Sequence, residues 1–140
     1  MGATSEGRRQ EVEVKRQRLN RLMTALELDG ILIGRRDNFA WATGGADNHV
    51  KLATETGAGM LLVLPDRWTL IATNIETPRL SREELESLPV PLDVEAAPWH
   101  LGVESAVERL VRGRRVGSDT GIAGTMNVHP ALAGLRLPLT

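Results

Sequence analysis

Histidine is the side chain in this sequence best suited to acid–base or metal chemistry near neutral pH, and the chain contains three histidines. His49, His100 and His129 are widely separated, and no two have the i, i+4 spacing that places both on one face of a helix. The sequence has no cysteine, which excludes a disulfide framework, a thiol nucleophile and a thiolate metal site. We therefore predict that each histidine is a surface or structural residue and that this chain alone binds no metal.

A second candidate for chemistry is the triplet Asp119-Thr120-Gly121, which aspartic proteases use in pairs so that two carboxyl groups share one proton. One copy would require a symmetric dimer of a small all-β fold, whereas here the triplet follows a predicted helix and a predicted strand. We interpret it as the end of a strand turning into a loop. The competing hypothesis, an aspartic protease dimer, requires peptidase activity at acid pH that the Asp119→Asn substitution abolishes.

The polar stretch from Gly45 to Gly57 contains Asp47, Asn48, His49 and Lys51. Short polar side chains directly after a buried strand are typical of a binding loop, because the strand fixes where the loop begins. This loop is the part of the chain where we expect function.

Composition describes an ordinary globular domain: 140 residues, 41% hydrophobic and 25% charged, with a net charge of −1. This length fits one domain with one core. The balanced charge gives no reason to expect nucleic acid or an anionic membrane as a partner. No apolar run approaches the roughly 18 residues of a membrane span, and the polar N-terminus does not resemble a signal peptide. We expect a cytoplasmic protein.

The elements that must position these residues begin with a helix from Glu11, whose apolar stripe is formed by Leu19, Leu22, Met23 and Leu26. The apolar run from Ile31 to Ile33 and the segment from Phe39 to Thr43 predict two strands, which we place at the centre of the sheet. Gly59 to Leu64 and Trp68 to Thr73, joined by Pro65-Asp66-Arg67, predict a β-hairpin.

In the second half of the sequence, predicted helices again alternate with predicted strands. Ser81 to Glu84 forms a capping box, which predicts a short helix ending near Leu88. Asp93 to Trp99 predicts a further strand, and Pro98 indicates either an edge strand or the end of the strand. The apolar stripe from Val103 to Val111 predicts a helix closed by Gly113. A short strand at Val116 to Asp119 follows, and His129-Pro130 opens a last turn or helix. Strands interleaved with helices predict an α/β fold with a mixed sheet and helices on both faces.

Two motifs in this framework resemble a known family. A helix followed by Asp29-Gly-Ile-Leu-Ile33 and then Asn38-Phe-Ala-Trp-Ala-Thr-Gly44 is similar to the N-terminal domain of the creatinase, prolidase and aminopeptidase P family. Trp41 stands where the family has an aromatic residue, whereas Ala42 replaces a bulkier residue and Gly45 replaces an aromatic one. The resemblance implies a three-layer α/β/α domain over residues 11–140, with a ribonuclease-H-like motif and five or six strands. The small and polar residues from Met1 to Gly7 predict a disordered N-terminus, which we place at residues 1–10.

The resemblance also implies that this chain is one domain of a larger Xaa-Pro peptidase and that a separate domain carries out catalysis. Its catalytic domain, absent from this chain, would hold two divalent ions (Mn, Co or Zn) through two Asp, one His and two Glu, and these ions would activate a water for hydrolysis. This chain would then be non-catalytic, contributing to oligomerisation as a homodimer or higher assembly, and to the shape of the substrate pocket. The pocket-lining residues would be Trp41, Asp47, Asn48 and His49. In the competing interpretation, Trp41 belongs to the core and His49 is a solvated loop residue. The alternative is a stand-alone binding or assembly module of the same fold.

Overall fold

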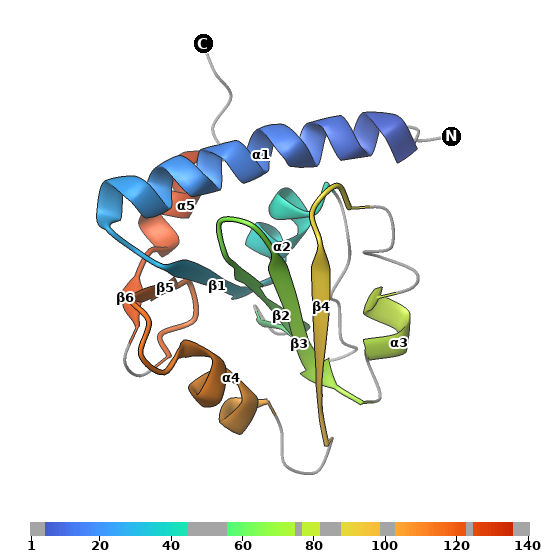
Figure 1. Ribbon diagram of the computed structural model, residues 1–140, viewed down its shortest axis with the longest axis vertical. Helices are drawn as coiled ribbons and strands as arrows, with labels where there is room; N and C mark the ends of the chain where they lie inside the picture. Colours follow the sequence, from blue (N-terminus) through green and yellow to red (C-terminus); the bar gives the residue numbers. More distant parts are fainter. Residues whose placement is uncertain are drawn as a thin grey trace.

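A mixed six-stranded sheet forms the middle layer of the structure (Figure 1), a computed structural model that describes residues 5–44, 56–74, 77–81, 88–98, 103–122 and 125–135. In these residues the strand order is β4-β3-β2-β1-β5-β6. The strands are β1 (Gly30–Arg35), β2 (Thr56–Val63), β3 (Trp68–Thr73), β4 (Leu92–Ala97), β5 (Val116–Ser118) and β6 (Met126–Asn127). The predicted α/β fold with a mixed sheet is confirmed.

Pairing in the sheet explains the predicted hairpin and the predicted edge strand. β2 pairs antiparallel with β3, with Val63 opposite Trp68, and also antiparallel with β1. β4 pairs parallel with β3 and ends at Ala97, one residue before Pro98, at the edge of the sheet. β1 and β5 are parallel neighbours, as are β5 and β6. Because β1 and β5 run in the same direction, their carboxyl ends meet at one edge of the sheet.

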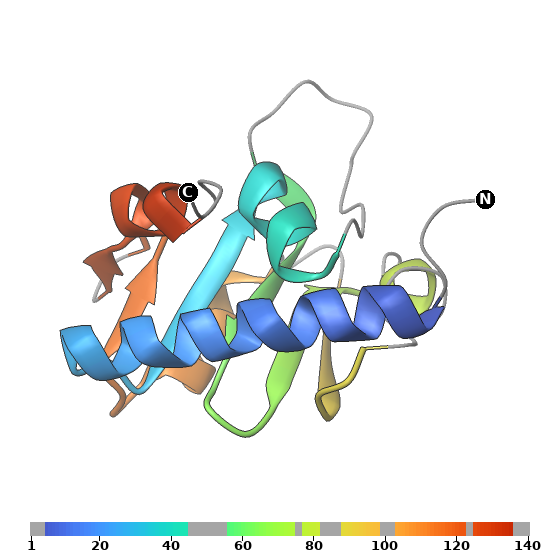
Figure 2. The same ribbon diagram turned by 90° about the horizontal axis from the view of Figure 1, so that it is seen from above.

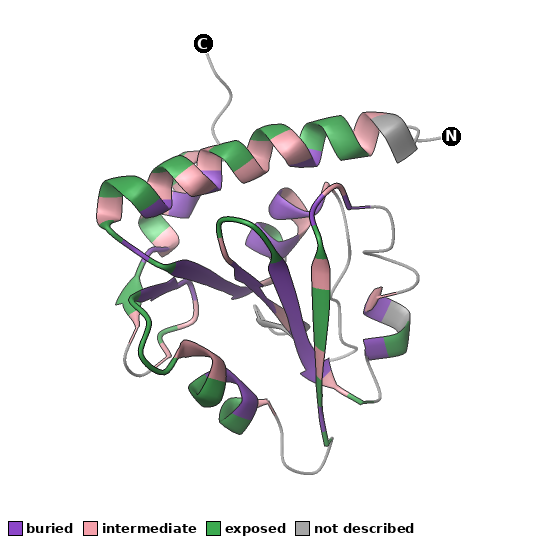
Figure 3. Cartoon of the chain, viewed as in Figure 1, coloured by how far each residue is buried: buried purple, intermediate pink, exposed green. Residues whose placement is uncertain are grey.

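Helices cover both faces of the sheet. On one side lie α1 (Ser5–Leu26), α2 (Arg36–Ala42) and α5 (His129–Leu135), which Figure 2 shows together, and α4 (Glu104–Val111) packs on the other side (Figure 1). The short α3 (Thr77–Arg79) lies between β3 and β4 in the chain. Ile31 and Ile33 of β1 pack with α1, α2 and α5, whereas Leu32 packs with α4. This burial on both faces, visible in Figure 3, explains the continuous apolar run that predicted β1.

The second predicted central strand is wrong, because residues 36–42 form helix α2. Phe39 and Ala42, three positions apart, are fully buried in the core, as expected for one face of a helix. The backbone at Gly44 has φ of 69°, a left-handed conformation that glycine adopts readily and that ends the helix. A five-residue apolar segment fits either a strand or a helix, so its periodicity did not distinguish them. The positions beside β1 belong to β2 and β5.

The other predicted elements agree with the structure, with differences at their ends. α1 begins at Ser5 rather than Glu11, and its early turns are held by bonds from Arg8 Nε to the Thr43 carbonyl (2.9 Å) and from Arg9 to the Leu88 carbonyl (3.3 Å). The predicted helices at Val103 and His129 and the strand at Val116 are present. β6 was not predicted. The helix predicted after Ser81 falls mainly on residues 82–87, which lie outside the described residues.

Gly117 of β5 lies where the chain has no space for a side chain. A Cβ atom there would lie 2.4 Å from Val128 Cγ1 and 3.0 Å from Leu28 Cδ1. We expect Gly117→Ala to lower the free energy of unfolding by about 1–3 kcal/mol, the usual cost of overpacking a core. Gly134→Ala, in α5, is the matched control, because nothing lies within 4 Å of its added Cβ. Urea denaturation should show that control to be neutral or more stable by up to ~1 kcal/mol; equal destabilisation of both variants would contradict the prediction.

Arg16 joins α1 to the β2–β3 hairpin. It forms an ion pair with Glu13 within the helix and also donates a hydrogen bond to the Pro65 carbonyl at 3.1 Å. The hydrogen bonds from Arg16 lower the pKa of Glu13 below its ordinary value, so the ionised form is favoured in the folded chain. This contribution is present above the unfolded-state pKa of Glu (about 4.3) and is lost as pH falls through the lower folded-state pKa.

We expect Glu13→Gln to lower the free energy of unfolding at pH 7 by about 0.5 kcal/mol, a value that allows for solvent screening of a side chain that is 35% exposed. The difference from the parent chain should shrink as the pH is lowered below 4. Urea titrations at several pH values measure it, and a difference that grows on acidification would contradict the assignment.

Candidate functional site

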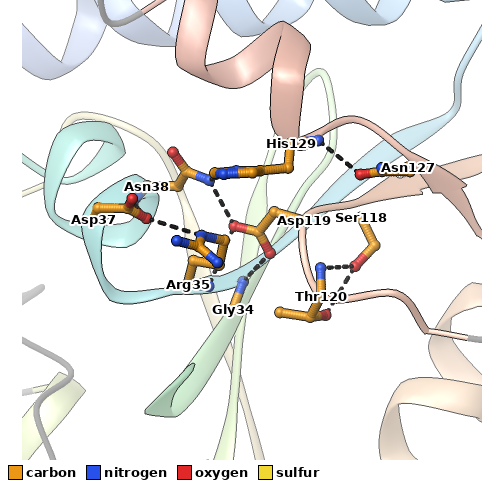
Figure 4. A network of polar contacts seen from close by, with 9 residues as sticks. All are labelled: Gly34, Arg35, Asp37, Asn38, Ser118, Asp119, Thr120, Asn127 and His129. Carbon is orange, nitrogen blue, oxygen red and sulfur yellow. Dashed lines mark hydrogen bonds and ion pairs between the residues drawn. The ribbon is translucent and has the colours of Figure 1, made fainter. Parts of the chain in front are cut away.

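The carboxyl ends of β1 and β5 meet at a buried polar cluster centred on Asp119 (Figure 4). Asp119 directly follows β5, and only 7% of it is exposed. Its Oδ1 accepts from the backbone N–H of Gly34 at 2.8 Å, and its Oδ2 accepts from the N–H of Arg35 at 3.2 Å and from Asn38 Nδ2 at 2.9 Å. The carboxylate therefore accepts three hydrogen bonds from the protein, which is what burial of such a group requires.

Asn38 connects this carboxylate to α5. Its amide nitrogen carries two hydrogens, and it lies 2.9 Å from Asp119 Oδ2 and 3.2 Å from His129 Nδ1. With one hydrogen directed to each acceptor, Nδ1 of His129 must present its lone pair, so the hydrogen of the neutral ring is on Nε2. The Asn38 Oδ1 atom has no hydrogen-bond partner among the described residues.

Hydrogen bonds and an ion pair between residues close in sequence complete the cluster at the start of α5, after β5 and at the start of α2. Asn127 Oδ1 accepts from the backbone N–H of His129 at 3.1 Å, which fixes the first residue of α5. Ser118 Oγ accepts from the N–H of Thr120 at 3.1 Å, which fixes the turn that follows β5. The Arg35 guanidinium pairs with Asp37 at 3.4 Å at the start of α2. All of these residues appear in Figure 4 around the junction of β1, β5, α2 and α5.

The arrangement around Asp119 is suited to holding structure together rather than to acid–base catalysis. Both carboxylate oxygens are occupied by donors from β1 and α2. β5 ends at Ser118, so the interpretation of the triplet as a strand end turning into a loop is confirmed. Sequence reasoning missed the partners of Asp119. Parallel strands bring polar residues at their carboxyl ends together, but the parallel pairing of β1 with β5 was not predicted from the sequence.

His129 is a structural histidine, as predicted, since its ring contacts Asn38 within the cluster. His49 and His100 lie outside the described residues. In the described part of the chain no three His, Asp or Glu side chains converge on a point where a metal could bind. These residues therefore do not fit the pair of divalent ions that the resemblance implies for the larger enzyme. None of the described helices has the length and apolar character needed to cross a membrane.

Trp41 lies on α2 and is half-buried, with part of its ring packed against the core. The Lys15 ammonium lies 5.2 Å from the centre of the ring, within the range of a cation–π contact, and also pairs with Glu11 at 3.1 Å as the helical spacing indicated. Asp47, Asn48 and His49 lie outside the described residues, so the predicted pocket lining stays a prediction.

Comparison with known proteins identifies the family. The family model for the creatinase/prolidase N-terminal domain matches residues 15–134, which is most of the chain. The chain therefore belongs to the creatinase/prolidase N-terminal domain family. No curated protein matches it in sequence.

Solved structures share the fold at low sequence identity. The prolidase from Pyrococcus horikoshii OT3 is 17% identical with a TM-score of 0.62, over 91% of this chain and 36% of that chain. The Xaa-Pro dipeptidase from Bacillus anthracis is 16% identical with a TM-score of 0.62, over 92% of this chain and 37% of that chain. This chain thus spans about a third of those two proteins.

A third structure has nearly the same extent as this chain. It is the creatinase/prolidase N-terminal domain of an X-Pro dipeptidase from Streptococcus pyogenes, 14% identical with a TM-score of 0.58, over 86% of this chain and 98% of that chain. This structure shares the fold and the extent of the chain, in agreement with the match to the creatinase/prolidase N-terminal domain family.

The cluster around Asp119 predicts a stability cost for removing Asn38, which is 1% exposed. Asn38→Ala leaves both Asp119 Oδ2 and His129 Nδ1 with one partner fewer in a buried place, so we expect a loss of about 1–3 kcal/mol in the free energy of unfolding. Asn20→Ala is the control, because its 3.3 Å bond to the Pro65 carbonyl is exposed. Chemical denaturation should give the control a loss below about 1 kcal/mol. A smaller loss for the Asn38 variant than for the control would be inconsistent with the cluster described above.

Proposed function

We propose that this chain is the non-catalytic N-terminal domain of an Xaa-Pro metallopeptidase and that it shapes the substrate pocket and takes part in subunit association. The observation that carries the proposal is the family match over residues 15–134. The similar extent of the isolated N-terminal domain from Streptococcus pyogenes supports the division between this domain and a separate catalytic one.

Trp41 is the described residue best placed to contribute to a pocket. Trp68 is fully buried in β3, whereas Trp41 is only half-buried on a short helix. An aromatic ring that is packed on one side and open on the other supplies a large, rigid contact surface for a small substrate. Asp47, Asn48 and His49 follow α2 in the chain, and we propose that they line the same pocket.

The hydrolytic chemistry would belong to the partner domain. Two divalent ions, Mn, Co or Zn, would be held there and would activate a water for attack on the peptide carbonyl. The described residues of this chain would contribute contacts and shape only. The proposed partners are its own C-terminal catalytic domain and at least one further copy of the protein.

The test is a comparison of the isolated chain with the protein encoded by the full open reading frame. We expect codons beyond Thr140 that encode the two Asp, one His and two Glu. In that longer protein Trp41→Ala should raise KM for an Xaa-Pro dipeptide about tenfold with little change in kcat, the effect of losing about 1.4 kcal/mol of uniform binding. Trp41→Phe, which keeps an aromatic ring, is the matched control, and its KM should be closer to that of the parent enzyme.

Two results would overturn the proposal. Hydrolysis of dipeptides by the 140-residue chain itself, with Mn, Co or Zn supplied, would place the catalytic groups within it. A reading frame that stops at Thr140 would favour the stand-alone binding or assembly module instead.

A further inference from the structure

Helix α2 begins where β1 ends, with no loop residues between the two elements. Arg35 is both the last residue of β1 and the N-cap of α2, and its side chain makes no capping hydrogen bond. The two successive N–H groups at this junction, from Gly34 and Arg35, are instead bound by Asp119, which lies about 85 positions later in the sequence. The direction in which the chain leaves the sheet after β1 is therefore fixed by the carboxylate of Asp119, the residue that follows β5.

The same carboxylate also fixes the first turn of α2 through Asn38. The apolar contacts of Phe39 and Ala42 hold α2 on the sheet, but such contacts are not directional. Hydrogen bonds require a particular distance and angle, so the bond from Asn38 to Asp119 sets the rotation of α2 about its axis. His129 Nδ1, on the other side of Asn38, ties that rotation to α5.

Trp41 follows Asn38 by three positions, so the two side chains lie on adjoining parts of the helix surface. A rotation or tilt of the first turn of α2 would move the indole ring relative to Lys15, which lies 5.2 Å from its centre. The far end of α2 is held separately, by the bond from Arg8 Nε to the Thr43 carbonyl at 2.9 Å. Asp119 thus controls the start of the helix and Arg8 controls its end.

We propose that Asp119 is a positioning residue: through Gly34, Arg35 and Asn38 it sets the orientation of α2 and hence of Trp41. The effect on the substrate pocket rests on the proposed function, in which Trp41 contributes to that pocket. The effect on the orientation of Trp41 does not depend on it.

The experiment is ¹⁹F NMR of the 140-residue chain labelled with 5-fluorotryptophan. The chain has three tryptophans, and the resonance that disappears in Trp41→Phe is the one from Trp41. In Asp119→Asn the new amide hydrogens face at least one of the three donors around the carboxylate, so a hydrogen bond is lost. We expect the Trp41 resonance to move by more than its linewidth and the Trp68 resonance to stay in place.

Two controls separate positioning from a general loss of stability. Asp66→Asn makes the same chemical change on an exposed turn residue and should leave all three resonances unchanged. Val107→Ala removes two methyl groups from the buried face of α4, on the opposite side of the sheet, and should lower stability while leaving the Trp41 resonance in place.

Asn38→Asp gives a second test that remains informative if Asp119→Asn does not fold. At pH 8 two carboxylates would face each other across the position of the 2.9 Å bond and repel. Under mildly acid conditions the pair takes up one proton, and the resulting O–H can donate to the other carboxylate as the amide does in the parent chain. The Trp41 resonance should be displaced at pH 8 and return towards the parent position on acidification. Because His129 Nδ1 lies 3.2 Å from the Asn38 amide and an imidazole changes charge in this pH range, the comparison is made in the His129→Gln background, where a purely steric role for Asn38 gives no such pH dependence.

A Trp41 resonance that stays at the parent position in both folded variants would overturn the inference. A displaced resonance combined with an unchanged KM for the Asp119 variant of the longer enzyme would support the positioning role and argue against the proposed pocket function instead. The two proposals can therefore fail separately.

Discussion

A buried carboxylate needs donors that replace its water, and the arrangement of this domain around Asp119 follows from that requirement. Moving an ionised group out of water without compensation costs far more than the net stability of a small domain. Here three donors supply the compensation, and they come from the end of β1 and the first turn of α2. The carboxylate can be satisfied only when β1 and β5 are in register, so a single charge specifies how α2 leaves the sheet.

The elements that could be predicted are those whose own residues decide their structure. Ile31 to Ile33 is buried on both faces of the sheet and is an uninterrupted apolar run in the sequence. The hairpin has an apolar segment on each side of Pro65, and these segments form β2 and β3. The helix that packs on the second face of the sheet has a clear apolar stripe and a glycine with φ of 76° just past its end. In each case local sequence and tertiary packing favour the same structure.

The elements that could not be predicted depend on distant residues. Phe39 to Thr43 fits a strand as well as a helix, and the choice is made by tertiary packing and by Asp119, which is 81 positions from Asn38. β6 consists of Met126 and Asn127 only and is defined by its pairing with β5 rather than by its sequence. The candidate site was missed for the same reason: Asp119, Asn38 and His129 are polar residues with no informative spacing, and only the parallel pairing of β1 with β5 brings them together.

The long separation between Asp119 and its partners also has a consequence for biosynthesis. The ribosome completes β1 and the residues of α2 well before it reaches Asp119, and His129 follows later still. During that interval the Gly34 and Arg35 N–H groups can bind only water, so the nascent α2 has no fixed direction. Closing a loop of about 85 residues costs chain entropy that grows with the logarithm of its length. The β2–β3 hairpin, whose strands are neighbours in the chain, can form during translation, but the orientation of α2 is determined only after Asp119, in the last third of the chain, has emerged.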